Sequence, residues 1–184
     1  FVLVGHSVGG RISVRYTMGN PERVNGLILL SASGAPRKEE GGPPMALRLM
    51  RNPVGRFFIK RIWSRNMARK TLEDMVFDKS SITDEEIDRM WDLSTYPGNM
   101  DAMFREFADS WEDFNPTEIR GITTNTLLIW GEEDSICPDS MGSWYDSQLP
   151  NSTMVVLPDI GHNPHFECPN RCLDEISSWM GTLS

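Results

Sequence analysis

Short apolar runs alternate with an amphipathic segment at the start of the chain. Residues 1–4 and 24–30 are apolar runs typical of strands buried on both faces of a parallel sheet, and residues 7–18 repeat apolar side chains at helical spacing. Gly19-Asn20-Pro21 ends the helix, because glycine favours a C-cap and proline cannot continue a helix. A strand, a helix and a strand in this order predict a right-handed crossover between parallel strands.

The same rhythm returns near the end of the chain. Apolar runs predict strands over 126–130 and 153–157, and helical patterns follow them over 138–149 and 166–180. The last of these helices carries four large apolar side chains at a spacing that predicts one buried stripe, namely Leu173, Ile176, Trp179 and Met180.

Between these parts, residues 35–121 contain no convincing strand. Methionine, arginine and aromatic residues recur there in helical patterns over 45–50, 54–69, 70–77, 84–94 and 99–111. The expected fold class is therefore α/β, with a parallel-sheet core made of residues 1–34 and 122–184. An all-helical insertion over 35–121 interrupts this core.

Composition and charge narrow the class of partner. The chain has 184 residues, 39% of them hydrophobic, which is enough for one sizeable core. Its net charge of −8 argues against nucleic acid as a partner, because nucleic-acid binding depends on neutralising phosphates. No apolar run approaches the roughly 20 residues of a membrane span. The three cysteines do not form a disulfide framework, and their sparing use favours a reducing compartment such as the cytoplasm.

A candidate nucleophile lies in the turn between the first strand and helix. Gly5-His6-Ser7-Val8-Gly9 fits the pattern G-x-S-x-G, in which both glycines are expected because larger side chains would clash in so sharp a turn. The turn presents the Ser7 hydroxyl at the carboxyl edge of the sheet, where the Val8 N–H can stabilise an oxyanion. A phosphate-binding loop is the alternative, but Gly10-Arg11-Ile12 lacks the Lys-Ser/Thr that it needs.

A nucleophilic serine needs a base, and the chain has three histidines. His162 lies in the loop after the last strand, where no core role requires a histidine, and is the favoured base. His165 is its competitor but lies nearer the closing helix. His6 adjoins Ser7 in the turn and is expected to be directed away from it.

The base in turn needs an orienting carboxylate. Asp134 follows the third strand, on the same sheet edge as Ser7, and the order Ser–Asp–His is typical of one hydrolase architecture. The segment after 24–30 contains no acid. Glu132, Glu133 and Asp159 are expected to be solvated loop acids.

Four segments carry a resemblance to a known family. They are VGHSVGG at 4–10, NPERVNGLILLSA at 20–32, LLIWGEEDSICP at 127–138 and DIGHNPHFECP at 159–169. In their order they resemble the α/β-hydrolase superfamily, in its cap-bearing branch of esterases and meta-cleavage-type C–C hydrolases. The resemblance implies the last four strands of that fold, with a helical cap inserted between the second and third of them.

The resemblance implies roles for the candidate residues. Ser7 would be the nucleophile, His162 the general base and then acid, and Asp134 the residue that orients the imidazole, with the Val8 N–H holding the oxyanion. No metal or organic cofactor is implied. The expected function is hydrolysis of a small carboxylic ester or related acyl compound. C–C bond hydrolysis of a vinylogous diketone acid and non-catalytic binding of a small molecule are the alternatives.

Substrate identity is expected to depend on side chains from the turn and the insertion. The candidates for substrate contact are His6, Met45, Trp63, Met103 and Phe104. A substrate carboxylate would favour Arg48 or Arg105 as its partner. Oligomeric state stays open.

The chain opens in mid-strand at Phe1, and the family's earlier strands, which carry a second oxyanion donor, are not among these residues. The sequence is therefore expected to be a C-terminal fragment. These 184 residues alone are expected to be poorly stable, because loss of half the sheet would leave an exposed edge and an uncovered core. They are also expected to be nearly inactive, since one oxyanion donor is worth about 10²–10³ in rate.

Overall fold

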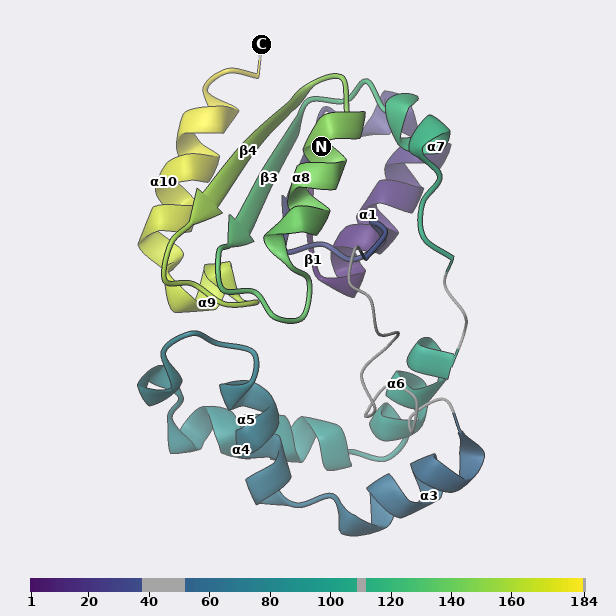
Figure 1. Ribbon diagram of the computed structural model, residues 1–184, viewed down its shortest axis with the longest axis vertical. Helices are drawn as coiled ribbons and strands as arrows, with labels where there is room; N and C mark the ends of the chain where they lie inside the picture. Colours follow the sequence, from purple (N-terminus) through teal and green to yellow (C-terminus); the bar gives the residue numbers. More distant parts are fainter. Residues whose placement is uncertain (38–51, 109–111, 184) are drawn as a thin grey trace. The chain divides into compact units, whose positions relative to one another are not determined.

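The computed structural model describes residues 1–37, 52–108 and 112–183 and divides the chain into two compact units (Figure 1). The first unit is Phe1–Lys38, Met75–Asp78 and Asp113–Ser184, and the second is Glu39–Asp74 and Lys79–Glu112. Sequence patterns assign 35–121 to the insertion as one block. In the structure, three parts of this block group with the first unit instead, namely residues 35–38, Met75–Asp78 and residues 113–121.

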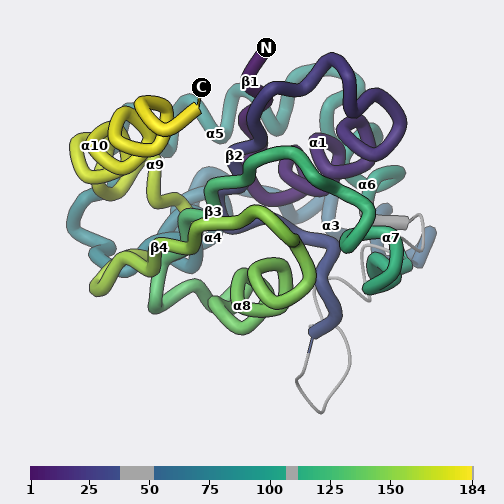
Figure 2. Tube along the Cα trace, turned by 90° about the horizontal axis from the view of Figure 1, so that it is seen from above, coloured from purple at the N-terminus to yellow at the C-terminus, as the bar shows by residue number. Residues whose placement is uncertain are grey.

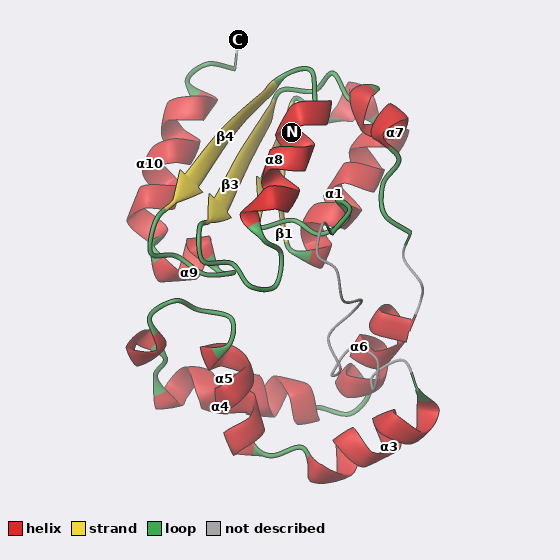
Figure 3. Ribbon diagram, in the orientation of Figure 1, coloured by secondary structure: helices red, strands yellow, loops and turns green. Residues whose placement is uncertain are grey.

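Four parallel strands form the centre of the first unit, in the order β1-β2-β3-β4. They are β1 (Val2–His6), β2 (Gly26–Leu30), β3 (Thr126–Gly131) and β4 (Ser152–Leu157). Figure 3 shows β3 and β4 side by side as yellow arrows. All three neighbouring pairs are parallel, with Ile28 opposite Leu127 and Trp130 opposite Val156. The expected α/β class and its four parallel strands are confirmed.

Helices cover both faces of this sheet, and Figure 2 shows α8 and α10 on opposite sides of it. Alternate side chains of β2 and β3 belong to two hydrophobic cores, one on each face of the sheet, because successive residues of a strand point to opposite faces. Leu29 and Trp130 pack with α1 (Val8–Gly19), α7 (Pro116–Arg120) and α8 (Asp139–Gln148). Ile28 and Ile129 pack with α10 (Pro169–Met180). Two short helices, η1 (Pro21–Arg23) and α9 (Pro164–Glu167), complete the unit.

The strand β1 differs from its expected burial. The apolar run predicts a strand buried on both faces, but Phe1 and Val4 are each 53% exposed. Among the described strands β1 pairs with β2 alone, so nothing in the described residues covers its other edge. Hydrophobicity indicates a strand but does not report its place in the sheet.

The closing helix also differs from its expected pattern. Proline at position 169 ends α9 and starts α10, so the single helix expected over 166–180 is two. The face of α10 that packs on the sheet carries buried Cys172 and Trp179 and partly buried Ile176, whereas Leu173 and Met180 are exposed. The prediction for those two side chains is wrong because the sheet touches a narrower arc of the helix than their apolar character suggested.

The second unit is helical in its described part. It comprises α3 (Pro53–Ile62), α4 (Arg65–Glu73), η2 (Lys79–Ser81), α5 (Asp84–Thr95) and α6 (Asn99–Ala108). The helix expected over 54–69 is split, because the Ser64 side chain caps α4 by accepting the Met67 N–H. Ala68, Ile87 and Phe104 are buried in this unit. The helix expected over 45–50 lies outside the described residues.

None of the described helices combines the length and the apolar character needed to cross a membrane.

One close approach of helix to strand sets the position of α1. A Cβ built on Gly10 would lie 2.4 Å from the Ala32 Cβ, closer than real Cβ atoms approach, and 3.1 Å from the Ala32 Cα. A Cβ on the neighbouring Gly9 would have no atom of the described part of the chain within 4 Å. Contact between α1 and the end of β2 therefore depends on the missing side chain at position 10.

This pair of glycines gives a matched test of stability. We expect Gly10→Ala to lower the free energy of unfolding by about 1–3 kcal/mol, because the helix must move away from Ala32. Gly9→Ala should be neutral or should stabilise by up to about 1 kcal/mol through helix propensity. Denaturant unfolding of both variants measures the difference, and equal effects would contradict the packing argument.

Candidate active site

Ser7 occupies a strained turn between β1 and α1. Its backbone has φ 51° and ψ −121°, a conformation that residues other than glycine rarely adopt. Its N–H donates to the Leu30 carbonyl at 3.0 Å, and its carbonyl accepts the N–H groups of Gly10 and Ser33, each at 3.0 Å. Bonds to the end of β2 and to the first turn of α1 thus hold the strained conformation.

The glycine requirement of this turn differs from the expectation. A Cβ on Gly5 would lie 2.5 Å from the Ser13 Oγ and 2.6 Å from the Gly9 carbonyl oxygen, so glycine is required there. The expected clash at Gly9 does not occur with any described residue, because a Cβ at that position would have none of them within 4 Å. Gly10, outside the five-residue motif, is the second tight position.

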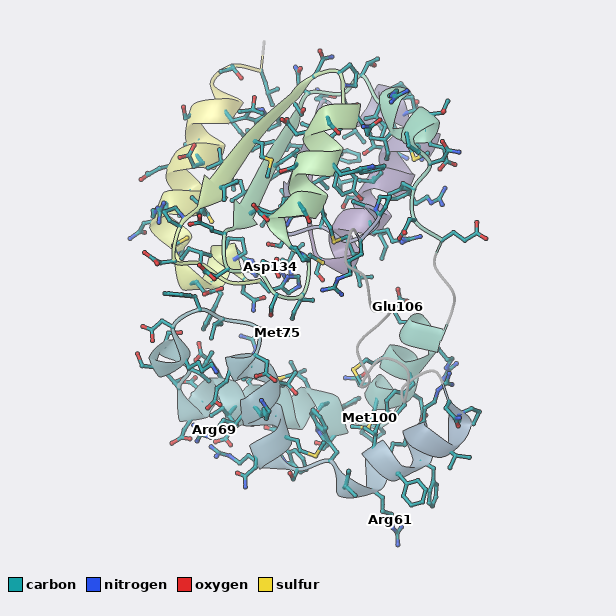
Figure 4. All side chains as sticks on the ribbon, in the orientation of Figure 1. Arg61, Arg69, Met75, Met100, Glu106 and Asp134 are labelled. Carbon is teal, nitrogen blue, oxygen red and sulfur yellow. The ribbon has the colours of Figure 1, made fainter. Side chains whose placement is uncertain are left out.

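Asp134 lies in the turn that follows β3 and is buried (Figure 4). Its Oδ1 accepts the N–H groups of Ile136 and Cys137, both at 2.9 Å. These bonds orient the carboxylate and offset the cost of burying it. The Oδ2 atom lies 2.8 Å from the Nδ1 of His162.

His162 lies in the loop after β4 and is also buried. Because a carboxylate only accepts, Nδ1–H is the donor to Asp134, and Nε2 is left without a proton in the neutral ring. The Ser7 Oγ lies 3.0 Å from that Nε2 and donates to it. The structure therefore brings together the three side chains that the sequence singled out, in an unbroken series of hydrogen bonds.

Glycine at the end of β3 lets the loop that carries His162 come close to Asp134. A Cβ on Gly131 would lie 2.1 Å from the Gly161 carbonyl oxygen and 2.3 Å from that of Ile160. The backbone before His162 therefore packs directly on the end of β3, three residues before Asp134. Glycine at position 131 therefore allows the loop of His162 to lie within hydrogen-bonding reach of Asp134.

His6 contacts the backbone of the loop that carries His162. Its Nε2–H donates to the His162 carbonyl at 2.8 Å, and its ring centroid lies 4.8 Å from that of His162 and 4.7 Å from that of His165. Burial is the main cause that lowers the pKa of His6 to about 4, against the opposing effect of this hydrogen bond. Partial burial also lowers the pKa of His165. His6 is therefore neutral at pH 7.

Val8 is the first residue of α1, so its N–H has no acceptor within the helix. It lies directly after Ser7, at the positive end of the helix dipole. The competing acids Glu132, Glu133 and Asp159 are exposed. In the described part of the chain, no group of three or more His, Cys, Asp or Glu side chains could hold a metal ion.

The candidate substrate contacts of the insertion lie in the second unit or outside the described residues. Phe104 is buried and Met103 half-buried. The indole N–H of Trp63 donates to the Ser94 Oγ at 2.8 Å, beside a surface pocket of about 270 Å³. Arg105 donates to the carbonyl of Asp101. Met45 and Arg48 lie outside the described residues.

Two groups that hold the backbone around His162 were not predicted from the sequence. The Met75 carbonyl accepts the His162 N–H at 2.8 Å, and the Glu167 carboxylate accepts the N–H groups on either side of it. No local pattern marks a backbone carbonyl as a partner. Glu167 could have drawn attention as an acid five residues after the base, close enough to return to its loop.

Comparison with known proteins agrees with this geometry. The family model described as "alpha/beta hydrolase fold" matches residues 1–169. The chain is 32% identical to "Uncharacterized hydrolase YugF" of Bacillus subtilis, over 97% of this chain and 64% of the relative. It is 25% identical to the "2-hydroxy-6-oxononadienedioate/2-hydroxy-6-oxononatrienedioate hydrolase" of Cupriavidus pinatubonensis, over 90% of this chain and 56% of the relative. The chain thus spans less than two thirds of these relatives.

Solved structures share the fold. The meta-cleavage product hydrolase of Pseudomonas fluorescens superimposes with a TM-score of 0.80 at 20% identity, over 98% of this chain and 64% of that one. A thermophilic esterase from Thermogutta terrifontis superimposes with a TM-score of 0.77 at 25% identity, over 100% of this chain and 65% of that one.

The depressed pKa of His6 predicts a pH dependence of stability. An unfolded histidine takes up a proton near pH 6.5, whereas folded His6 resists protonation until about pH 4. The unfolded chain therefore binds more protons in this window, and the free energy of unfolding should fall as pH drops from 6.5 to 4. Allowing for solvent screening, we expect His6 to contribute about 2 kcal/mol to this fall.

His6→Gln isolates that contribution, because an amide can still donate to the His162 carbonyl but does not titrate. Denaturant unfolding between pH 7 and pH 4 should give a shallower decline for this variant than for the parent. Parallel curves would show that His6 is not protected from protonation.

Proposed function

Because the chain belongs to the α/β-hydrolase fold family, we propose that it carries the catalytic residues of a serine hydrolase acting on a small carboxylic ester or related acyl compound. One observation carries the proposal. Ser7 Oγ, His162 Nε2, His162 Nδ1 and Asp134 Oδ2 form a continuous series, with distances of 3.0 Å and 2.8 Å at its two hydrogen bonds. A serine hydroxyl bonded to an oriented, neutral imidazole is the arrangement that activates a nucleophile.

In the first half-reaction, the Ser7 Oγ attacks the acyl carbon while His162 Nε2 takes its proton. Asp134 stabilises the resulting imidazolium through the Nδ1–H bond and is not itself protonated. The carbonyl oxygen becomes an oxyanion, which the Val8 N–H stabilises at the start of α1. His162 then gives its proton to the leaving alcohol oxygen, and the ester C–O bond breaks to leave an acyl group on Ser7.

In the second half-reaction, water replaces the alcohol. His162 Nε2 takes a proton from the water as its oxygen attacks the acyl carbon, and the second oxyanion again accepts from Val8. The bond to Ser7 Oγ breaks, His162 returns the proton to that oxygen, and the carboxylic acid leaves.

The relatives favour a second candidate with the same residues. Several curated relatives, at 25–28% identity, are named for hydrolysis of 2-hydroxy-6-oxo dienoic and trienoic diacids, which is C–C bond cleavage. Ser7, His162 and Asp134 would serve that chemistry too, with a carbon leaving group in place of an alcohol. A substrate carboxylate would then need a cationic partner such as Arg105.

Labelling with a fluorophosphonate tests the nucleophile. In the complete polypeptide that contains these residues, we expect one adduct by intact mass for the parent and none for Ser7→Ala. Asp134→Asn should slow labelling by about 10²–10⁴-fold, because an amide favours the wrong imidazole tautomer. Ser178→Ala, an exposed position on α10, should label like the parent.

A folded parent that forms no adduct would contradict the proposal. The hydrogen-bonded side chains would then be unused, and non-catalytic binding of a small molecule would become the better account of the protein.

Turnover separates the two hydrolase candidates. We expect a higher kcat/KM for a short-chain p-nitrophenyl ester than for a 2-hydroxy-6-oxo dienoic acid, with Ser7→Ala abolishing both. A higher value for the dienoic acid would establish the second candidate. Arg105→Ala should then raise KM for the acid alone, with Arg89→Ala on α5 as the control.

A further inference from the structure

The backbone N–H groups of residues 161–163, in the loop that carries His162, donate to acceptors outside that segment. The N–H groups of Gly161 and Asn163 both donate to the Glu167 carboxylate, at 3.0 Å to Oε2 and 3.1 Å to Oε1 respectively. The N–H of His162, between them, donates to the Met75 carbonyl at 2.8 Å. Three consecutive amides are therefore held by groups that lie outside the three-residue segment.

Glu167 can reach this loop because a single short helix separates them. The helix α9 spans Pro164–Glu167, and the Glu167 N–H donates back to the Asn163 carbonyl at 2.9 Å. The chain thus turns once and returns its carboxylate to the amides that precede the turn.

The same carboxylate also binds a segment distant in sequence. Its Oε2 accepts the Phe77 N–H at 2.8 Å, within the stretch Met75–Asp78 that belongs to the first unit although the residues on both sides of it belong to the second. A Cβ on Gly161 would lie 2.8 Å from the Phe77 nitrogen and 2.9 Å from the Met75 carbonyl oxygen. The base loop and this segment therefore touch backbone to backbone.

The other side of His162 is fixed as well, because its carbonyl accepts the His6 Nε2–H at 2.8 Å. Only the imidazole remains to be oriented, by Asp134 on one nitrogen and Ser7 on the other. Movement of the loop would therefore lengthen the bond to Ser7 directly.

We propose that Glu167 is a positioning residue for His162: its carboxylate holds the loop 161–163 against Met75–Phe77 and so sets the reach of the imidazole to Ser7. The inference rests on the proposed function, in which His162 is the base. A carboxylate suits this place, because its two oxygens accept several N–H groups at once and charge strengthens each bond. Glutamine has one acceptor oxygen, and its NH₂ would face a donor.

The test compares Glu167→Gln and Glu167→Asp with Glu22→Gln, an exposed change of the same chemistry on η1. In the complete polypeptide, well below its melting temperature, we measure the fluorophosphonate labelling rate, kcat and KM for an ester, and Tm. We expect Glu167→Gln to lower labelling and kcat by about 10–10²-fold, since displacements near 1 Å cost that much, while KM changes little. Glu167→Asp should recover part of the rate, and Glu22→Gln should match the parent.

Hydrogen exchange gives a readout that does not require activity. We expect faster exchange in Glu167→Gln over peptides containing 161–163 and Phe77, with no change in β3. Wild-type labelling rate and kcat in folded Glu167→Gln would overturn the inference. So would a fall in Tm or loss of folding in both variants without a slower chemical step per folded molecule, since Glu167 would then be structural.

The two proposals fail separately. A parent that is never labelled overturns the proposed function, and this inference with it. A parent that is labelled, beside a folded Glu167→Gln that is labelled equally fast, overturns this inference alone.

Discussion

The hydrogen bond between the His162 imidazole and the Asp134 carboxylate is the interaction on which the site depends. Both side chains are buried, and at 2.8 Å the bond joins the turn after β3 to the loop after β4. A buried carboxylate is costly unless its oxygens are satisfied, and here the N–H groups of Ile136 and Cys137 complete its set of donors. The same bond selects the imidazole tautomer that can accept a proton from Ser7.

The parallel sheet makes this bond possible, because it brings the carboxyl ends of its strands to one edge. Ser7 follows β1, Asp134 follows β3 and His162 follows β4, so three turns distant in sequence meet there. Glycine at position 131 lets two of these turns pack backbone to backbone. The strain at Ser7 is held by bonds to the end of β2 and to α1, which places the hydroxyl at that edge in advance of any substrate.

The candidate catalytic residues and most of the candidate substrate contacts lie in different units of the chain. Ser7, His162 and Asp134, the proposed nucleophile, base and acid, all belong to the first unit, together with the Met75–Asp78 segment that contacts the loop of His162. The candidate substrate contacts Trp63, Met103 and Phe104 belong to the second. Proteins that share this fold cleave different bonds, so family membership leaves the leaving group open, and the helical unit is where selectivity is expected to arise.

The sequence by itself determined the alternation of parallel strands and helices and the three side chains of the candidate site. Apolar runs and a Gly-x-Ser-x-Gly turn are local patterns tied to local structure, and Ser7, Asp134 and His162 each follow a predicted strand. Only the tertiary structure decided the exposure of Leu173, the tight packing at Gly10, and the partners of His162. Each of these depends on which segment lies opposite, through contacts such as that between Phe77 and Glu167, which sit 90 residues apart along the chain. The hydrophobic pattern of a sequence predicts which side chains are buried, but it does not specify which distant segment of backbone they contact.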